Sequence, residues 1–380
     1  SIKLKGSTDG SVTLQAPADT SPTGSDKTFT LPTQDGNSGQ VLQTNGSGAL
    51  SFTDNRIPPG QNLLVNGAMT VAQRGTVSGI TSSQYAACDR YKTAVSSLGT
   101  WTASQVTSSP FGFSKALRLD CTTANASPAA GGYIVIMYSI EGQDVQHLRY
   151  GSSTAQDLTI SFYVRSNKTG FASFEIQQKD NSDRQYIAPY TIYAANTWEK
   201  KTIIIPGDSS GLINDDTGVG LRLSWWLNSG STYSTGFPAS TWEAEVNANR
   251  NSYNLGVGGS TSDYFEFSGV KLEVGEVATD YIHQSYGDVL QQCERYFQQW
   301  KGDGTPSTQN VISGAAGINS NASACYVVPS PKMRGPFSVE FADLIISDSA
   351  TYDADVTAMN LTNASGDGAY VTASHAANGG

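Results

Sequence analysis

From about Asn62 to Ile282 the chain reads as one strand after another, and this pattern constrains its fold more than any other feature. Segments such as TWTASQV, YIVIMYSI, DLTISFYVRS and FASFEIQQ are alternating or continuously apolar, and Gly, Pro, Asn, Asp and Ser residues separate them. No long helical period interrupts the series. We therefore predict an all-β fold, an antiparallel jelly-roll sandwich.

The texture of the sequence changes at three places. Residues 1–55 contain short alternating strands between turns, and residues 56–284 form the predicted jelly-roll module. Residues 285–301 have the spacing of an amphipathic helix, and residues 302–380 return to short strands. The last segment is predicted to be a small C-terminal β-domain.

The N-terminal region has too few large apolar residues to build a core of its own, because a domain of fewer than about 60 residues is only marginally stable. Val12 and Leu14, and likewise Phe29 and Leu31, point to one face of their predicted strands. We expect this face to be buried against copies of the same region. A flexible tail that docks onto another protein is the alternative.

The predicted helix lies in the segment SYGDVLQQCERYFQQW. Ser285 can cap its N-terminus, with Asp288 three residues further on. Leu290, Phe297 and Trp300 belong to its apolar stripe, and we predict that they contribute to oligomerisation.

Two adjacent tryptophans stand in the strand GLRLSWWLNSG. Since neighbouring residues in a strand point to opposite faces, Trp225 is predicted to be in the core and Trp226 on the outer face or under a loop. An outward indole can stack on a sugar ring. The residues that we predict as ligand contacts are Trp226, Asn228, Tyr233, Phe237 and Trp242. Packing under a covering loop or in a subunit interface is the alternative.

Several kinds of function are disfavoured. The net charge of -10, without any run of Lys or Arg, argues against nucleic-acid binding. No apolar run has the length of a membrane helix, about 18–20 residues. The three histidines and four cysteines form no zinc motif, and no catalytic residues stand out. We therefore expect no cofactor, although Asp208, Asp215 and Asp216 in a Gly/Asp-rich stretch could bind Ca²⁺.

Several segments are spread over about residues 60–300, among them NLLVNGAMTVAQRGT, IEGQDVQHLRYG, YTIYAANTWEKKTIIIPGD and SGVKLEVGEVATDY. They resemble segments of a family of bacteriophage virion proteins, the tail fibres with a carbohydrate-binding-like module. The resemblance implies a jelly roll, a homotrimer and a role in adsorption to the host surface.

The function expected from these features is that of a non-enzymatic fibre or spike, assembled in the host cytoplasm and carried on the virion. Its expected partners are two further copies, tail or adaptor proteins that contact the N-terminal region, and a host-surface glycan or receptor. The alternatives are a purely structural virion protein, such as a head fibre, a decoration protein or a tail adaptor, and, more distantly, a glycan depolymerase.

Overall fold

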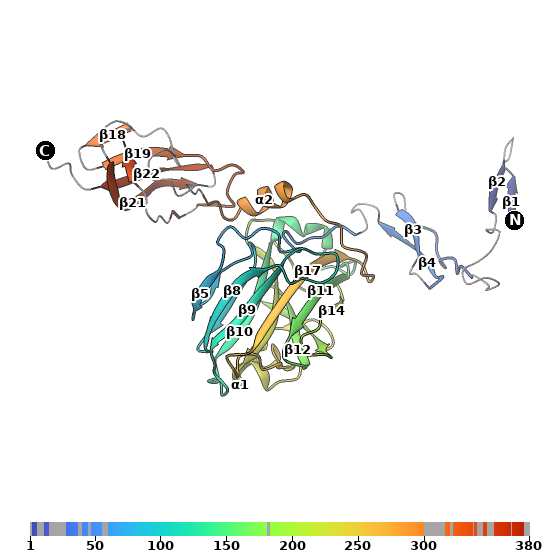
Figure 1. Cartoon of the computed structure of the whole chain (residues 1–380). Helices are drawn as coiled ribbons and strands as arrows, with labels where there is room; N and C mark the ends of the chain where they lie inside the picture. The colour runs from blue at the N-terminus through green and yellow to red at the C-terminus, as the bar shows by residue number, and fades with distance from the viewer. Residues whose placement is uncertain are drawn as a thin grey trace. The chain divides into compact units, whose positions relative to one another are not determined.

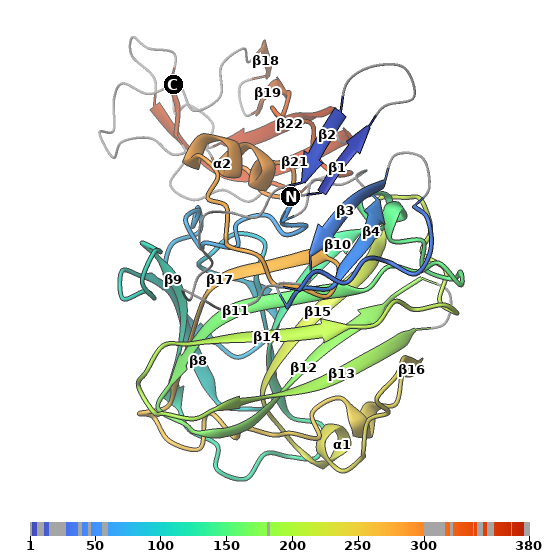
Figure 2. The ribbon, with the colours of Figure 1, turned by 90° about the vertical axis from the view of Figure 1, so that its right-hand side faces the viewer.

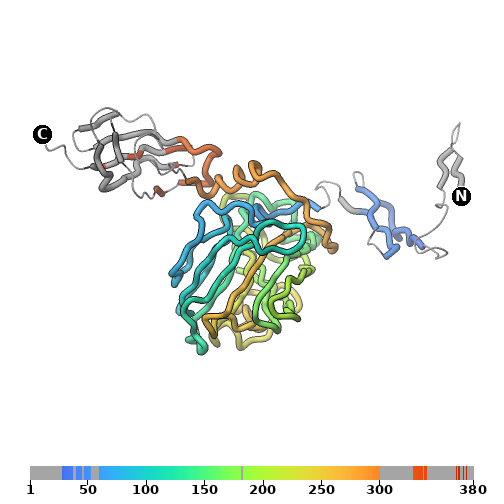
Figure 3. The backbone as a smooth tube through the Cα atoms, viewed as in Figure 1, coloured from blue at the N-terminus to red at the C-terminus, as the bar shows by residue number. Residues whose placement is uncertain are grey.

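The computed structural model describes most of the chain (Figures 1 and 3). The described residues are 2–5, 11–14, 28–36, 40–44, 47–54, 60–180, 183–299, 316–319, 322–336, 338–339, 345–347, 353–365 and 367–375. They belong to two compact units, Ser1–Pro59 and Gly60–Gly380.

The larger unit contains a sandwich of two antiparallel sheets, which confirms the predicted all-β fold (Figure 2). The seven-stranded sheet consists, in spatial order, of β16 (Glu243–Ala244), β13 (Arg184–Ile192), β12 (Gly170–Gln178), β15 (Val219–Ser229), β10 (Tyr133–Glu141), β7 (Lys92–Ser96) and β6 (Gln84–Tyr85). The six-stranded sheet consists of β14 (Glu199–Ile205), β11 (Leu158–Ser166), β17 (Tyr264–Val274), β9 (Ala116–Thr123), β8 (Thr100–Val106) and β5 (Val77–Ile80).

The core lies between the two sheets and follows the alternation of the strands. In β15 the inward residues are Leu221, Leu223, Trp225 and Leu227, and all of them are buried in the main apolar cluster. The Trp225 ring meets Phe162, Phe174 and Phe267 edge to face, with centroid separations of 5.9, 5.4 and 4.7 Å. The sequence prediction that Trp225 is a core residue is confirmed.

The two ends of the sandwich differ. The chain enters it near Gly60, beside Thr279, and leaves it through α2 (Tyr286–Glu294), both at the end where β17 finishes. We call this the connected end. β15 runs the other way and leads into the single-turn helix α1 (Ser231–Ser234), which lies at the opposite end (Figures 1 and 2). We call that the distal end.

Helix α2 is shorter than the predicted segment 285–301. Ser285 caps it as expected, since its side chain accepts a hydrogen bond from the Asp288 N–H at 3.2 Å. The helix ends at Glu294 because the next residues turn to Glu141: Arg295 donates through Nε and Nη2 at 3.1 and 2.8 Å, and Tyr296 through its hydroxyl at 2.5 Å. Tertiary contacts thus stop a helix that the local pattern would extend. No helix in the described part of the chain is long and apolar enough to cross a membrane.

The C-terminal part of this unit forms a five-stranded antiparallel sheet. Its strands, in spatial order, are β18 (Ala316–Asn319), β19 (Ala322–Val327), β22 (Gly368–His375), β21 (Asp353–Ser365) and β20 (Ile345–Ser347). They lie within the region where short strands were predicted.

The N-terminal unit consists of two small hairpins. β1 (Ile2–Lys5) pairs with β2 (Ser11–Leu14), and β3 (Gln40–Thr44) pairs with β4 (Leu50–Asp54). Thr30 adds a bridge to Ala49 beside β4. Four large apolar side chains of this unit are exposed, Phe29 by 65%, Leu31 by 70%, Leu42 by 49% and Phe52 by 39%, whereas Val41 and Leu50 are partly buried.

Candidate functional site

Trp226 lies on the outer face of the seven-stranded sheet, the face turned away from the six-stranded sheet. It is nevertheless only 1% exposed, because residues of segment 230–256 cover it. Its ring packs in a small cluster with Ala94 and Val135, and Tyr233 lies against it at a centroid separation of 5.3 Å. The structure therefore has the arrangement given above as the packing alternative, an outward indole under a loop.

A buried ion pair holds this cover in place. The Trp226 indole N–H donates to Glu175 Oε2 at 2.8 Å, and Arg250 Nε donates to Glu175 Oε1 at 2.7 Å. The Arg250 guanidinium also lies 5.1 Å from the centroid of the Trp226 ring, within cation–π range. Burial alone would lower the pKa of Arg250, but the adjacent Glu175 carboxylate outweighs it and raises that pKa.

Sequence reasoning did not find this pair. The alternation of FASFEIQQ puts Glu175 on the outer face, but Arg250 lies 75 residues further along in a loop. No local signal could have brought the two together.

The other predicted ligand contacts are dispersed. Tyr233 belongs to the Trp226 cluster and meets Tyr133 edge to face at 5.6 Å. Asn228 is buried and donates to the main-chain oxygen of Val257 at 3.0 Å. Trp242 is half-buried and donates to the Pro206 oxygen at 2.6 Å, near the connected end, while Phe237 is 92% exposed. These residues do not converge on one open site.

The predicted oligomerisation residues fall into three groups. Phe29 and Leu31 are exposed. Leu290 packs against the cluster of Val71, Val289 and Cys293, and the Phe297 ring centroid lies 3.5 Å from the Arg74 guanidinium. The side chains of Val12 and Leu14, and all of Trp300, lie outside the described residues.

The aspartates considered for Ca²⁺ do not face one another. Asp208 is buried and paired with Arg184 at 2.7 Å, Asp215 is exposed, and Asp216 accepts from the Gly218 N–H at 2.7 Å. Within the described part of the chain, no three His, Cys, Asp or Glu side chains gather to hold a metal ion.

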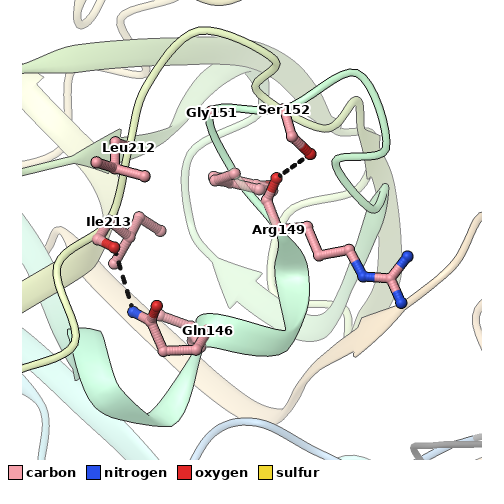
Figure 4. A pocket seen from close by; sticks show the side chains of 8 residues that line it. Gln146, Arg149, Gly151, Ser152, Leu212 and Ile213 are labelled. Atoms are coloured by element: carbon pink, nitrogen blue, oxygen red, sulfur yellow. Dashed lines mark hydrogen bonds between the residues drawn. The ribbon is translucent and has the colours of Figure 1, made fainter.

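A shallow pocket of about 380 Å³ opens at the connected end (Figure 4). Its lining consists of Val145, Gln146, Arg149, Tyr150, Gly151, Ser152, Leu212 and Ile213. The Gln146 amide nitrogen donates to the main-chain oxygens of Ile213 and Asn214 at 3.3 and 2.9 Å. Since these bonds join the two loops that form the pocket, we interpret it as the seam between them. None of the predicted ligand contacts lines it.

The distal end carries aromatic side chains that are open to solvent. Besides Phe237, Phe171 at the start of β12 is 59% exposed and Tyr193 after β13 is 79% exposed. Sequence reasoning missed Phe171, although its place in the outward register of β12 was a usable signal.

No family model matches the chain, and no curated protein sequence matches it significantly. Its fold is similar to several solved structures. The enzymatically active domain of tailspike protein 4 of bacteriophage CBA120 is 10% identical with a TM-score of 0.28, over 56% of this chain and 21% of that one. A putative sugar binding protein from Bacteroides thetaiotaomicron is 12% identical with a TM-score of 0.33, over 57% of this chain and 100% of that one. A family 11 carbohydrate-binding module from Clostridium thermocellum is 14% identical with a TM-score of 0.27, over 52% and 96%.

Proposed function

We propose that the chain is a non-catalytic subunit of a trimeric phage tail fibre or spike. In this proposal residues 1–55 assemble and attach the subunit, and the β-sandwich recognises a glycan on the host surface. The observation that carries the proposal is the uncovered apolar surface of the N-terminal unit.

Its exposed side chains belong to segments that are neighbours in the sheet. Leu42 and Phe52 stand directly opposite each other in the β3–β4 hairpin. Phe29 and Leu31 flank Thr30, whose backbone N–H donates to the Gly48 oxygen and whose oxygen accepts from the N–H of Leu50, the first residue of β4. Exposed apolar patches and open strand edges are typical of surfaces that associate. Three copies related by a rotation axis would bury these side chains and close the edges.

The difference between the two ends of the sandwich supports the recognition part of the proposal. Both chain connections leave from the connected end, so the distal end lies away from the points where the rest of the chain is attached. Three exposed aromatic rings, those of Phe171, Tyr193 and Phe237, lie at the distal end. Hydroxyl and amide side chains are abundant in the chain, and charged residues make up only 15% of it. Flat rings beside neutral polar groups suit a glycan.

Mass photometry of the full chain at submicromolar concentration tests the assembly, and we expect the mass of three chains. The Leu42→Asp/Phe52→Asp double variant should yield monomers whose sandwich melts as in the wild type. The Phe111→Ala variant, which removes a fully exposed ring at the connected end, serves as the control and should remain trimeric.

Fluorescent full-length protein incubated with a panel of bacterial strains tests recognition, and we expect it to bind cells of one host group. A wild-type chain that mass photometry finds to be a monomer would contradict the trimeric assembly. A trimer that binds no strain would instead favour a purely structural place in the virion.

A further inference from the structure

We infer that Phe171 and Tyr253 form a stacking platform for a neutral pyranose ring at the distal end of the sandwich. This inference rests on the proposed glycan recognition and assigns it to a site. Phe171 is the second residue of β12 and points to the outer face, in the same row as Ser173, Glu175 and Gln177. Those three polar side chains are completely buried, whereas the Phe171 ring is 59% exposed.

The second ring is held in place by its backbone. The Tyr253 N–H donates to Ser173 Oγ at 3.1 Å, which fixes the segment across the outer face. On either side, the Asn251 N–H bonds to the Tyr233 oxygen at 2.7 Å and the Asn254 side-chain amide bonds to the Ser229 oxygen at 2.9 Å. The Tyr253 ring therefore lies beside Phe171, with centroids 6.2 Å apart and planes inclined by 47°.

This arrangement is the reverse of what burial alone would produce. On the outer face, the polar side chains of β12 lie under the covering segment 230–256, whereas the aromatic pair lies at the edge of the covered area, where it is open to solvent. A phenyl ring that is more than half exposed gains little from the hydrophobic effect in the isolated chain. The two rings, held in place by main-chain hydrogen bonds, would instead bury their exposed faces when a ligand with a flat apolar surface binds.

The surroundings indicate the chemistry of the ligand. On the same face, the carboxylate of Glu175 is buried and paired with Arg250, whose side chain is only 12% exposed. Thr191, directly opposite Phe171 in the β12–β13 register, and the Tyr253 phenol supply hydroxyl groups. A ligand with an apolar C–H face and equatorial hydroxyls, and without net charge, fits this combination. A pyranose has these properties.

The test measures binding of the full chain to immobilised neutral oligosaccharides of glucose, galactose, mannose and N-acetylglucosamine. We expect Phe171→Ala and Tyr253→Ala each to weaken binding at least about tenfold, as expected for an anchor ring. Phe171→Tyr, which keeps the ring, should stay within about threefold of the wild type. The matched control is Phe111→Ala, which removes an exposed phenyl ring at the connected end and should leave binding unchanged.

The outcomes distinguish a failure of this inference from a failure of the proposed glycan recognition. Wild-type binding that Phe171→Ala does not weaken, with an unchanged melting temperature, overturns the platform and leaves glycan recognition standing. Binding to host cells without binding to any neutral oligosaccharide overturns the pyranose assignment. A Phe171→Ala variant that loses its trimeric mass shows that a second copy occupies the platform, and this also overturns the inference. A chain that binds neither cells nor sugars would overturn both the stacking platform and the proposed glycan recognition.

Discussion

The buried pair of Glu175 and Arg250 allows one perturbation with a definite expected size. Arg250→Met removes the guanidinium charge but keeps an apolar stem that can still lie on Trp226. The Glu175 carboxylate is 0% exposed. After the substitution it retains only the Trp226 indole N–H among the donors that the structure gives it.

Leaving one partner of a buried ion pair uncompensated typically costs about 3–5 kcal/mol of unfolding free energy. In a domain of 150–250 residues, 1 kcal/mol corresponds to a change in melting temperature of about 2–4 °C. We therefore expect Arg250→Met to lower the melting temperature of the sandwich by about 6–20 °C. The double variant Glu175→Gln/Arg250→Met should recover most of this loss, because it buries no charge.

Differential scanning calorimetry of the full chain measures the effect. The matched control is Lys332→Met, which breaks the Lys332–Asp367 pair, whose side chains are 63% and 68% exposed. Surface pairs of this kind contribute about 0–1 kcal/mol. If Arg250→Met shifted the melting temperature no more than Lys332→Met, or if the double variant were less stable than the single one, the reasoning would be refuted.

Two further predictions concern the packing of single groups. Trp226→Ala should lower the free energy of unfolding by about 3–5 kcal/mol, because the indole is buried. Chemical denaturation measures this change. A variant of unchanged stability that only loses adsorption would show that the ring contacts a ligand instead. Burial alone would raise the pKa of Glu141, but the bonds from Arg295 and Tyr296 outweigh it and lower that pKa below 4.5. Its contribution to holding α2 should thus be complete above pH 4.5 and disappear as the pH falls through the lowered value, and Glu141→Gln should abolish this pH dependence in hydrogen exchange of the α2 amides.

Some features of the Phe171–Tyr253 platform and of the covering segment 230–256 could have been predicted from the sequence, and others could not. The outward direction of Phe171 follows from the alternation of β12. Its exposure depends on how much of the outer face segment 230–256 covers. Tyr253 lies beside Phe171 only because its backbone reaches Ser173. Such placements depend on contacts between residues far apart in the chain, which no local pattern encodes.

The sequence by itself determined the all-β class and the opposite directions of Trp225 and Trp226, because both follow from the two-residue period of a strand. It also placed the cap of α2 at Ser285, since capping is a local interaction. Only the tertiary structure decided that Trp226 is covered, that α2 ends at Glu294, and that Glu175 meets Arg250. The physical reason is that the local backbone fixes the direction in which a side chain points, whereas its burial depends on which segment, distant in sequence, packs against it.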